Sequence, residues 1–206
     1  TLHFLIEEVY NLFYEISLRK SNGRLHRMIE QIVEYNKKFV ENKGYEPYLT
    51  SKYPNKKLAV LTCMDTRLIE LLPAALGLKN GDAKIIKNAG GVITHPYGSV
   101  VRSLLVAILE LGVEQVMVIG HTDCGVQGMD GNELLGELVE RGIDKEHIDI
   151  VRHSGIDLEK WLGGFESVEK SVEETVHALK THPLMPKNIE IKGFIMDSET
   201  GELTEV

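Results

Sequence analysis

Residues 58–67 read Leu-Ala-Val-Leu-Thr-Cys-Met-Asp-Thr-Arg, and this stretch decides the fold class. Its first five residues form a short, mostly apolar run, which is typical of a strand buried on both faces of a sheet. The polar residues that follow lead into a predicted helix over residues 67–76, which Gly77 ends. A buried strand followed directly by a helix is the first unit of an α/β fold.

The same alternation continues to the end of the chain. It predicts strands over residues 58–62, 83–87, 115–119 and 191–196 and a short final strand over 202–206, with helices over 67–76, 97–111, 133–141, 145–152 and 167–180. Such alternation implies an α/β fold with a mostly parallel central sheet that helices cover on both faces. We therefore expect a single α/β domain over residues 44–206.

Residues 1–43 have a different, helical pattern. Apolar side chains recur there at helical spacing, as seen at Leu25, Met28, Ile29, Ile32, Val33 and Phe39. The sequence Ser21-Asn22-Gly23 predicts a break between two helices, and residues 1–20 are apolar as well. Because so much apolar helix surface needs a cover, we predict an N-terminal helical arm over residues 1–43 that packs on a partner subunit.

The composition excludes several classes of partner. The 206-residue chain carries a formal net charge of −8, which argues against nucleic acid or an anionic membrane as the main partner. No apolar run approaches about 18 residues, so no transmembrane helix is expected. The first ten residues include Glu7 and Glu8 and no basic cluster, so we expect no signal peptide and predict a cytoplasmic protein.

The chain has only two cysteines, Cys63 and Cys124, which excludes a disulfide scaffold. Cys63 directly follows the predicted strand 58–62, and the sequence Gly-His-Thr-Asp-Cys-Gly over residues 120–125 directly follows the strand 115–119. Ligands bind at the carboxyl ends of strands in open parallel sheets, so neighbouring strands could bring the two segments together. The two cysteines could therefore form one bridge or share a metal ion.

His121 and Cys124 are spaced to chelate one metal ion from a single loop, and Cys63 adds a third soft ligand. Two thiolates and one imidazole suit zinc, and three protein ligands leave a fourth position for water, as in catalytic zinc sites. Asp65, held by the fork of Arg67, could accept a hydrogen bond from that water or, if released, fill the open position itself. Simpler interpretations remain: Cys63 as a buried apolar residue, Asp65 as a helix N-cap and Arg67 as a surface charge.

The sequence Cys-Met-Asp-Thr-Arg over residues 63–67, followed by the segment 120–125, resembles the paired motifs of the β-class carbonic anhydrases. Residues 80–90 and 193–197 are also similar to that family, above all to its short prokaryotic and archaeal members on the plant-type side. The resemblance implies one zinc ion per subunit, held by Cys63, His121 and Cys124. It further implies that a hydroxide at the fourth position attacks carbon dioxide to give bicarbonate and a proton.

The resemblance also implies the fold, the assembly and the roles of neighbouring residues. Asp65 and Arg67 would form the catalytic dyad that orients or gates the hydroxide. The substrate pocket would lie beside four residues, namely Asn88, Gly90, Gly91 and Gly125. The implied sheet has four parallel strands and a fifth, antiparallel strand. The implied assembly is a homo-oligomer, a dimer or a dimer of dimers, in which the N-terminal helix reaches over the partner.

One position departs from the family pattern, because Pro54 stands where plant-type members carry a substrate-binding Gln. Two alternatives to carbon dioxide hydration stay open: hydrolysis of carbonyl sulfide or carbon disulfide on the same scaffold, and a non-catalytic zinc protein that senses bicarbonate. His95, in a loop after the second strand, is either a proton shuttle or a surface histidine. We expect Trp161 to be a packing residue and four further histidines to face solvent, namely His147, His153, His177 and His182.

Overall fold

The computed structural model describes residues 27–206. The predicted first helix, over residues 1–20, and the break at residues 21–23 lie outside the described residues. The chain divides between Leu49 and Thr50 into two compact units. No helix within residues 27–206 combines the length and the hydropathy needed to cross a bilayer.

The first unit contains a helix over residues 27–41 and the short 3-10 helix η1, Glu46–Tyr48. The ring of Phe39 lies 6.3 Å from the ring of Tyr48, so η1 packs back on the end of the longer helix. This contact extends the unit beyond residue 43, where the sequence placed its boundary. The helix carries a row of exposed apolar side chains, which comprises Met28, Ile29, Ile32, Val33, Tyr35 and Val40.

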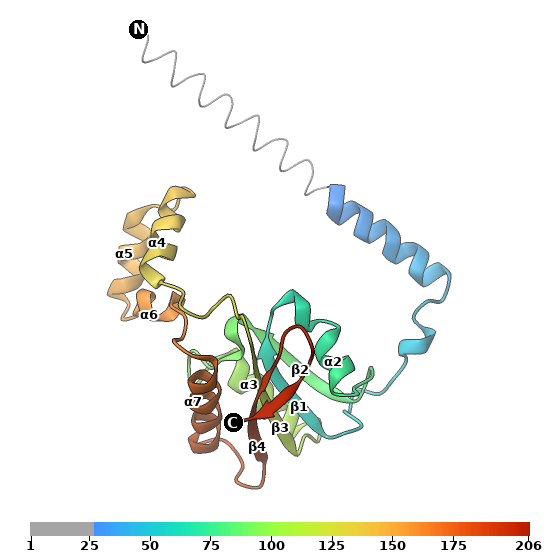
Figure 1. The fold of residues 1–206 in the computed structure, drawn as a ribbon. Helices are drawn as coiled ribbons and strands as arrows, with labels where there is room; N and C mark the ends of the chain where they lie inside the picture. The colour runs from blue at the N-terminus through green and yellow to red at the C-terminus, as the bar shows by residue number, and fades with distance from the viewer. Residues whose placement is uncertain (1–26) are drawn as a thin grey trace. The chain divides into compact units, whose positions relative to one another are not determined.

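The second unit is built on a five-stranded sheet with the order β2-β1-β3-β4-β5 (Figure 1). The strands are β1 Leu58–Cys63, β2 Ala83–Asn88, β3 Gln115–His121, β4 Glu190–Met196 and β5 Leu203–Glu205. The first four run parallel, and β5 pairs with β4 in the antiparallel direction. The structure thus confirms the predicted fold class, with its four parallel strands and antiparallel edge strand.

Strand β1 is flanked by β2 and β3, and its residues from Ala59 to Cys63 are buried. Both faces of a parallel sheet are covered, which explains why this strand is an unbroken apolar run up to Thr62. Strand β1 ends at Cys63, and the neighbouring β3 ends at His121, with Thr62 paired to Ile119. The register therefore places the two predicted metal-binding segments at one edge of the sheet.

Three helices flank the sheet, namely α2 Leu71–Ala75, α3 Ser99–Leu109 and α7 Val168–Thr181. Helix α7 lies against β3 and β4, where two glycines permit the close approach. A Cβ atom on Gly120 would come within 2.7 Å of Val168, and one on Gly193 would come within 2.7 Å of Val172. The absence of side chains at these two strand positions is therefore a packing requirement.

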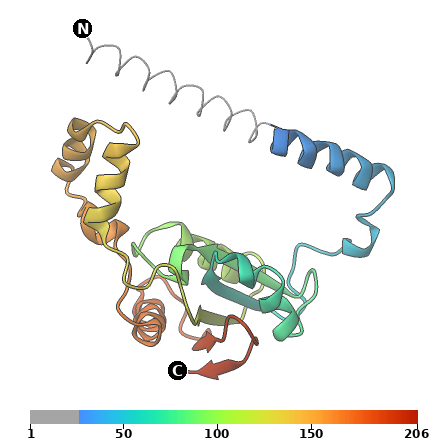
Figure 2. The same cartoon turned by 45° about the horizontal axis from the view of Figure 1, so that its top comes forward.

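A lobe of three helices lies between β3 and β4 in the chain and stands to one side of the sheet in both views (Figures 1 and 2). It consists of α4 Gly131–Glu140, α5 Lys145–His153 and α6 Leu158–Leu162. Its own small core joins Leu135, Ile148 and Leu158, one residue from each helix.

The prediction of one helix over residues 67–76 is wrong. The segment forms two shorter helices, η2 Thr66–Leu68 and α2 Leu71–Ala75. Pro73 explains the interruption, because it has no N–H to donate and its ring would clash with the carbonyl of residue 69 in a continuous helix. Helix α6 was not predicted, although Asp157 caps it by accepting from the Lys160 amide.

Two side chains lie where the sequence did not place them. Trp161 is 57% exposed on α6 instead of packing in the interior. His182, expected at the surface, is buried: its Nε2 donates to the Pro96 carbonyl at 2.8 Å, and its Nδ1 accepts from the Leu184 amide at 3.2 Å. Both partners are backbone groups of loops, so side-chain periodicity cannot reveal them.

Candidate metal centre

The carboxyl edge of the sheet brings Cys63, His121 and Cys124 together. One ligand atom from each side chain lies within 4.8 Å of the other two, and the two sulfur atoms are 3.9 Å apart. All three side chains are buried, and both cysteines are free thiols. Cys63 is the last residue of β1 and His121 the last of β3, while Cys124 follows in the loop after β3. The spacing of the sulfur atoms leaves room for a metal ion rather than a bridge.

The ring of His121 is oriented by its own loop. Its Nδ1 lies 2.8 Å from the Thr122 carbonyl, which can only accept, so Nδ1 carries the proton and Nε2 presents its lone pair. Among residues 27–206, Nε2 is a buried side-chain nitrogen without a partner at hydrogen-bonding geometry. An orphaned imidazole nitrogen beside two thiols is what a metal ion would satisfy, and this donor set fits zinc.

The two thiols are electrostatically different. Burial acts to raise the pKa of Cys63, but the neighbouring imidazole of His121 and hydrogen bonds from the amides of Asp65 and Gly90 outweigh it and lower that pKa to about 7. Burial dominates at Cys124 and raises its pKa. Since the thiolate is the form that binds a metal, Cys63 is the ligand prepared near neutral pH.

Asp65 and Arg67 form a forked ion pair beside these ligands. Arg67 donates from Nε to Asp65 Oδ1 at 3.0 Å and from Nη2 to Oδ2 at 2.9 Å. Asp65 Oδ1 also accepts from the Arg67 amide at 2.8 Å, so this carboxylate is the N-cap of η2 as well. The hydrogen bonds from Arg67 lower the pKa of Asp65 to about 2, which keeps it ionised. Its Oδ2 lies 3.9 Å from Nε2 of His121.

A second partner holds Arg67 from the other side of the site. Arg67 Nη1 donates to Asp123 Oδ2 at 2.8 Å, and Nη2 donates to the Asp123 carbonyl at 2.7 Å. Asp123 lies between His121 and Cys124 and has a positive φ of 53°. Sequence reasoning missed this residue, although an Asp directly before Cys-Gly is a signal for a turn that adopts the left-handed conformation.

The loop after β3 has a further anchor that the sequence did not indicate. The hydroxyl of Thr122 accepts from the Ser198 amide at 3.0 Å and lies 3.2 Å from the Ser198 hydroxyl. Ser198 is buried in the turn that joins β4 to β5. The residue whose carbonyl orients His121 is therefore fixed by the last turn of the chain.

The segment after β2 lies against the cysteine of β1. Asn88 donates from Nδ2 to the Val92 carbonyl at 2.7 Å and accepts from the Val92 amide at 3.1 Å, so its side chain closes this turn. Gly91 packs on the β1 backbone, where a Cβ atom would lie 2.9 Å from the Thr62 carbonyl carbon. A Cβ atom on Gly90 would meet Phe165 at 3.0 Å. The backbone at Gly90 and Gly91 is therefore closely packed, against Phe165 and against the end of β1.

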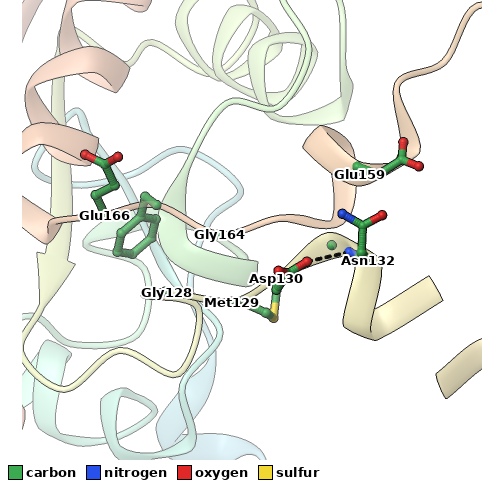
Figure 3. A pocket seen from close by; sticks show the side chains of 9 residues that line it. Gly128, Met129, Asp130, Asn132, Glu159, Gly164 and Glu166 are labelled. Atoms are coloured by element: carbon green, nitrogen blue, oxygen red, sulfur yellow. Dashed lines mark hydrogen bonds between the residues drawn. The ribbon is translucent and has the colours of Figure 1, made fainter. Parts of the chain in front are cut away.

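Gly125, the fourth residue assigned to the pocket from the resemblance, lies in the loop that carries Cys124. Space around it is open, because a Cβ atom there would meet nothing within 4 Å. A separate pocket of about 350 Å³ lies where the three-helix lobe joins the sheet (Figure 3). Its lining comprises Gly128, Met129, Asp130, Gly131, Asn132, Glu159, Gly164, Phe165 and Glu166 and includes none of the three candidate ligands.

The acidic residues of that pocket already have partners. Asp130 caps α4 by accepting from the Asn132 amide at 2.7 Å, as the dashed line in Figure 3 shows. Glu159 pairs with Arg152, and Glu166 lies 3.9 Å from the Lys170 amine. The described residues of the pocket therefore offer no unpaired carboxylate, and its lining is distinct from the candidate metal centre.

Comparison with known proteins gives a consistent result. A family model described as carbonic anhydrase matches residues 58–203. The Bacillus subtilis (strain 168) protein YvdA, which bears a provisional carbonic anhydrase name, is 51% identical over 178 residues, covering 86% of this chain and 90% of that protein. A carbon disulfide hydrolase of Acidithiobacillus thiooxidans is 32% identical over 158 residues, covering 72% of this chain and 76% of that protein.

A solved structure is similar over most of its length. The crystal structure of β-carbonic anhydrase isoform I from Trichomonas vaginalis matches with a TM-score of 0.77 at 36% identity. The match covers 86% of this chain and 96% of that chain.

Proposed function

The chain belongs to the β-class carbonic anhydrases, a family of enzymes, and we propose that it catalyses the reversible hydration of carbon dioxide to bicarbonate and a proton. The proposed cofactor is one zinc ion per subunit, held by Cys63, His121 and Cys124. The observation that carries the proposal is the unpartnered Nε2 of His121, buried between two thiols and 3.9 Å from an ionised Asp65. A zinc ion held by these residues would supply a Lewis acid that makes water a nucleophile near neutral pH.

The role of Asp65 follows from its protonation state. Arg67 holds the pKa of this carboxyl at about 2, so Asp65 does not store the proton that hydration releases at neutral pH. Its remaining function is to accept a hydrogen bond from the attacking water and so to orient it. Two bonds from Arg67 fix the carboxylate, and a fixed acceptor holds the water in one orientation. The proton must pass to another group or to buffer.

His95 is the candidate for that group, and its assignment as a proton shuttle stays a prediction. Its Nδ1 accepts from the Tyr97 amide at 3.0 Å, which fixes the ring and places the proton of the neutral imidazole on Nε2. Carbon dioxide itself needs an apolar surface beside the nucleophile. The backbone of Gly90 lies beside Cys63, and the apolar side chains of Phe165 and Val126 lie next to Gly90.

Hydrolysis of carbon disulfide or carbonyl sulfide is the second candidate. It is favoured by the 32% identity to a protein named carbon disulfide hydrolase, and both substrates are linear and apolar like carbon dioxide. A bicarbonate-sensing protein without turnover would not need the dyad, and here Asp65 and Arg67 form a complete ion pair. We therefore rank carbon dioxide hydration first and the sensor last.

Two parallel assays on zinc-loaded protein test the proposal. Stopped-flow hydration with a pH indicator should show a carbon dioxide rate well above that of buffer. Sulfide release from carbonyl sulfide and carbon disulfide should be slow on the same preparation. Fast sulfide release with hydration no better than buffer would replace the first candidate by the second, and inactivity in both assays would contradict both.

We also propose that the chain is a homo-oligomer, at least a dimer, in which the N-terminal arm covers a partner subunit. The support is the row of exposed apolar side chains on the helix over residues 27–41. Deletion of residues 1–43 should lower the sedimentation coefficient to that of a monomer, and an unchanged assembly would contradict the role of the arm. The free thiols and the net charge of −8 support a cytoplasmic protein that binds neither nucleic acid nor membranes.

A further inference from the structure

We infer that Asp123 is a positioning residue that anchors the guanidinium of Arg67, so that Asp65 stays paired with Arg67 and away from the metal position. The inference rests on the proposed function, because it assigns a partner to the dyad of that site. The carboxylate of Asp123 bonds to Arg67 rather than to a candidate metal ligand. It acts through Arg67, which it meets at two atoms.

The first step of the argument is the division of the Arg67 donors. Asp65 takes Nε and one bond from Nη2, while Asp123 takes Nη1 with its carboxylate and Nη2 with its carbonyl. The guanidinium thus bonds both to Asp65 on its own segment and to Asp123, which lies 56 residues further along the chain. A planar fork bound on both sides cannot swing away without breaking several charge-assisted bonds.

The second step is the backbone of Asp123. Its φ of 53° lies in the left-handed region, which Asp tolerates better than most residues but which still costs energy. This conformation turns the carbonyl and the side chain of one residue toward the same guanidinium. Because His121 and Cys124 flank Asp123, the loop that carries two ligands also fixes Arg67.

The third step is the position of Asp65. Its Oδ2 lies 3.9 Å from Nε2 of His121, so the carboxylate is close enough to compete for a metal ion held there. The side chain of Arg67 is 37% exposed, and Asp65 alone would have to restrict its long, flexible chain. The two hydrogen bonds to Asp123 supply that restriction. Its own side chain is 86% exposed, so water screens its charge and the effect is mainly one of position.

Two variants distinguish the effect of Asp123 on the position of Arg67 from the effect of its charge. Asp123→Gly keeps the left-handed turn and the backbone carbonyl but removes the carboxylate. Asp123→Asn is the matched control, because it removes the charge yet keeps an oxygen acceptor where Oδ2 receives Nη1 and also tolerates positive φ. A positioning role predicts that Asp123→Asn stays near the wild type while Asp123→Gly does not.

The first measurement uses zinc-free protein and needs no activity. The hydrogen-exchange rate of the Arg67 Nε–H group, followed by ¹⁵N NMR, reports how firmly the guanidinium is held. We expect Asp123→Gly to exchange about threefold faster, as suits the loss of one exposed charged contact. If the Arg67 Nε–H group of Asp123→Gly exchanged at the wild-type rate, the inference would be overturned.

The second measurement is thiocyanate binding to the cobalt-substituted protein, read from its visible absorption. Thiocyanate must take the open metal position, so a released Asp65 competes with it. Asp123→Gly should bind thiocyanate about threefold more weakly, and Asp123→Asn should retain most of the affinity. Equal losses in both variants, or wild-type affinity in both, would overturn the positioning role. Both readouts remain interpretable if the wild type fails to hydrate carbon dioxide, so the two proposals fail separately.

Discussion

Gly91 lies where the turn after β2 presses on β1, and its replacement by alanine should destabilise the protein more than its backbone angle alone explains. Its φ is 68°, and an L-residue in that region loses roughly 1–2 kcal/mol. The new Cβ would also lie 2.9 Å from the Thr62 carbonyl carbon and 3.0 Å from the Cys63 nitrogen. Backbone atoms cannot rotate aside, so overpacking adds about 1–3 kcal/mol. Gly91→Ala should therefore lower the free energy of unfolding by roughly 2–5 kcal/mol.

Gly77 provides the matched control, because its φ is 62° and a Cβ there would meet nothing within 4 Å. Urea unfolding of zinc-free protein should show that Gly77→Ala loses only the backbone contribution. Gly91→Ala should also weaken zinc affinity in a competition titration, since the displaced backbone carries the Cys63 ligand. If Gly91→Ala costs no more than Gly77→Ala, then the close approach at β1 does not shape the site as we describe.

Three further predictions concern single groups. Asp65→Ala should keep one zinc per chain by metal analysis but lose about 100-fold in hydration rate, because orientation of the attacking water is lost; wild-type turnover would contradict this. Zinc affinity should fall with falling pH, because the buried Cys124 thiol, whose pKa is raised, must release a proton on binding, and the fall should steepen below about pH 7, where Cys63 is protonated as well; a chelator competition that is flat between about pH 6 and pH 8 would refute this. His182→Leu should cost about 1–3 kcal/mol in thermal unfolding, because the buried imidazole loses two hydrogen bonds, to the Pro96 carbonyl and from the Leu184 amide, each worth about 0.5–1.5 kcal/mol; an unchanged melting temperature would show that water replaces them.

The grouping of Cys63, His121 and Cys124 could be predicted because strand ends are visible in sequence. The apolar run up to Thr62 marks the end of β1, and the pattern before His121 marks the end of β3. Parallel strands then bring their carboxyl ends to one edge, so Cys63 and Cys124 could be placed near each other without coordinates. Both interpretations of Asp65 hold in the structure, as N-cap and as partner of Arg67.

What could not be predicted depends on contacts between distant segments or on backbone angles. Asp123 reaches Arg67 only because of a left-handed turn, and the buried position of His182 depends on a loop carbonyl 86 residues away. The interruption at Pro73 is visible in the sequence, because a proline inside a helix lacks the N–H donor and clashes with the carbonyl four residues earlier. Trp161 lies on the exposed side of a five-residue helix that is too short to give a periodic pattern.

The central claim is that the cluster of Cys63, His121 and Cys124 holds one zinc ion with which this chain hydrates carbon dioxide. The most direct test is a zinc titration of metal-free protein, with the hydration rate measured by stopped flow at each addition. Our account predicts a rate that rises in proportion to bound zinc and stops rising at one ion per chain. A protein that binds one zinc per chain yet hydrates carbon dioxide no faster than buffer would contradict it.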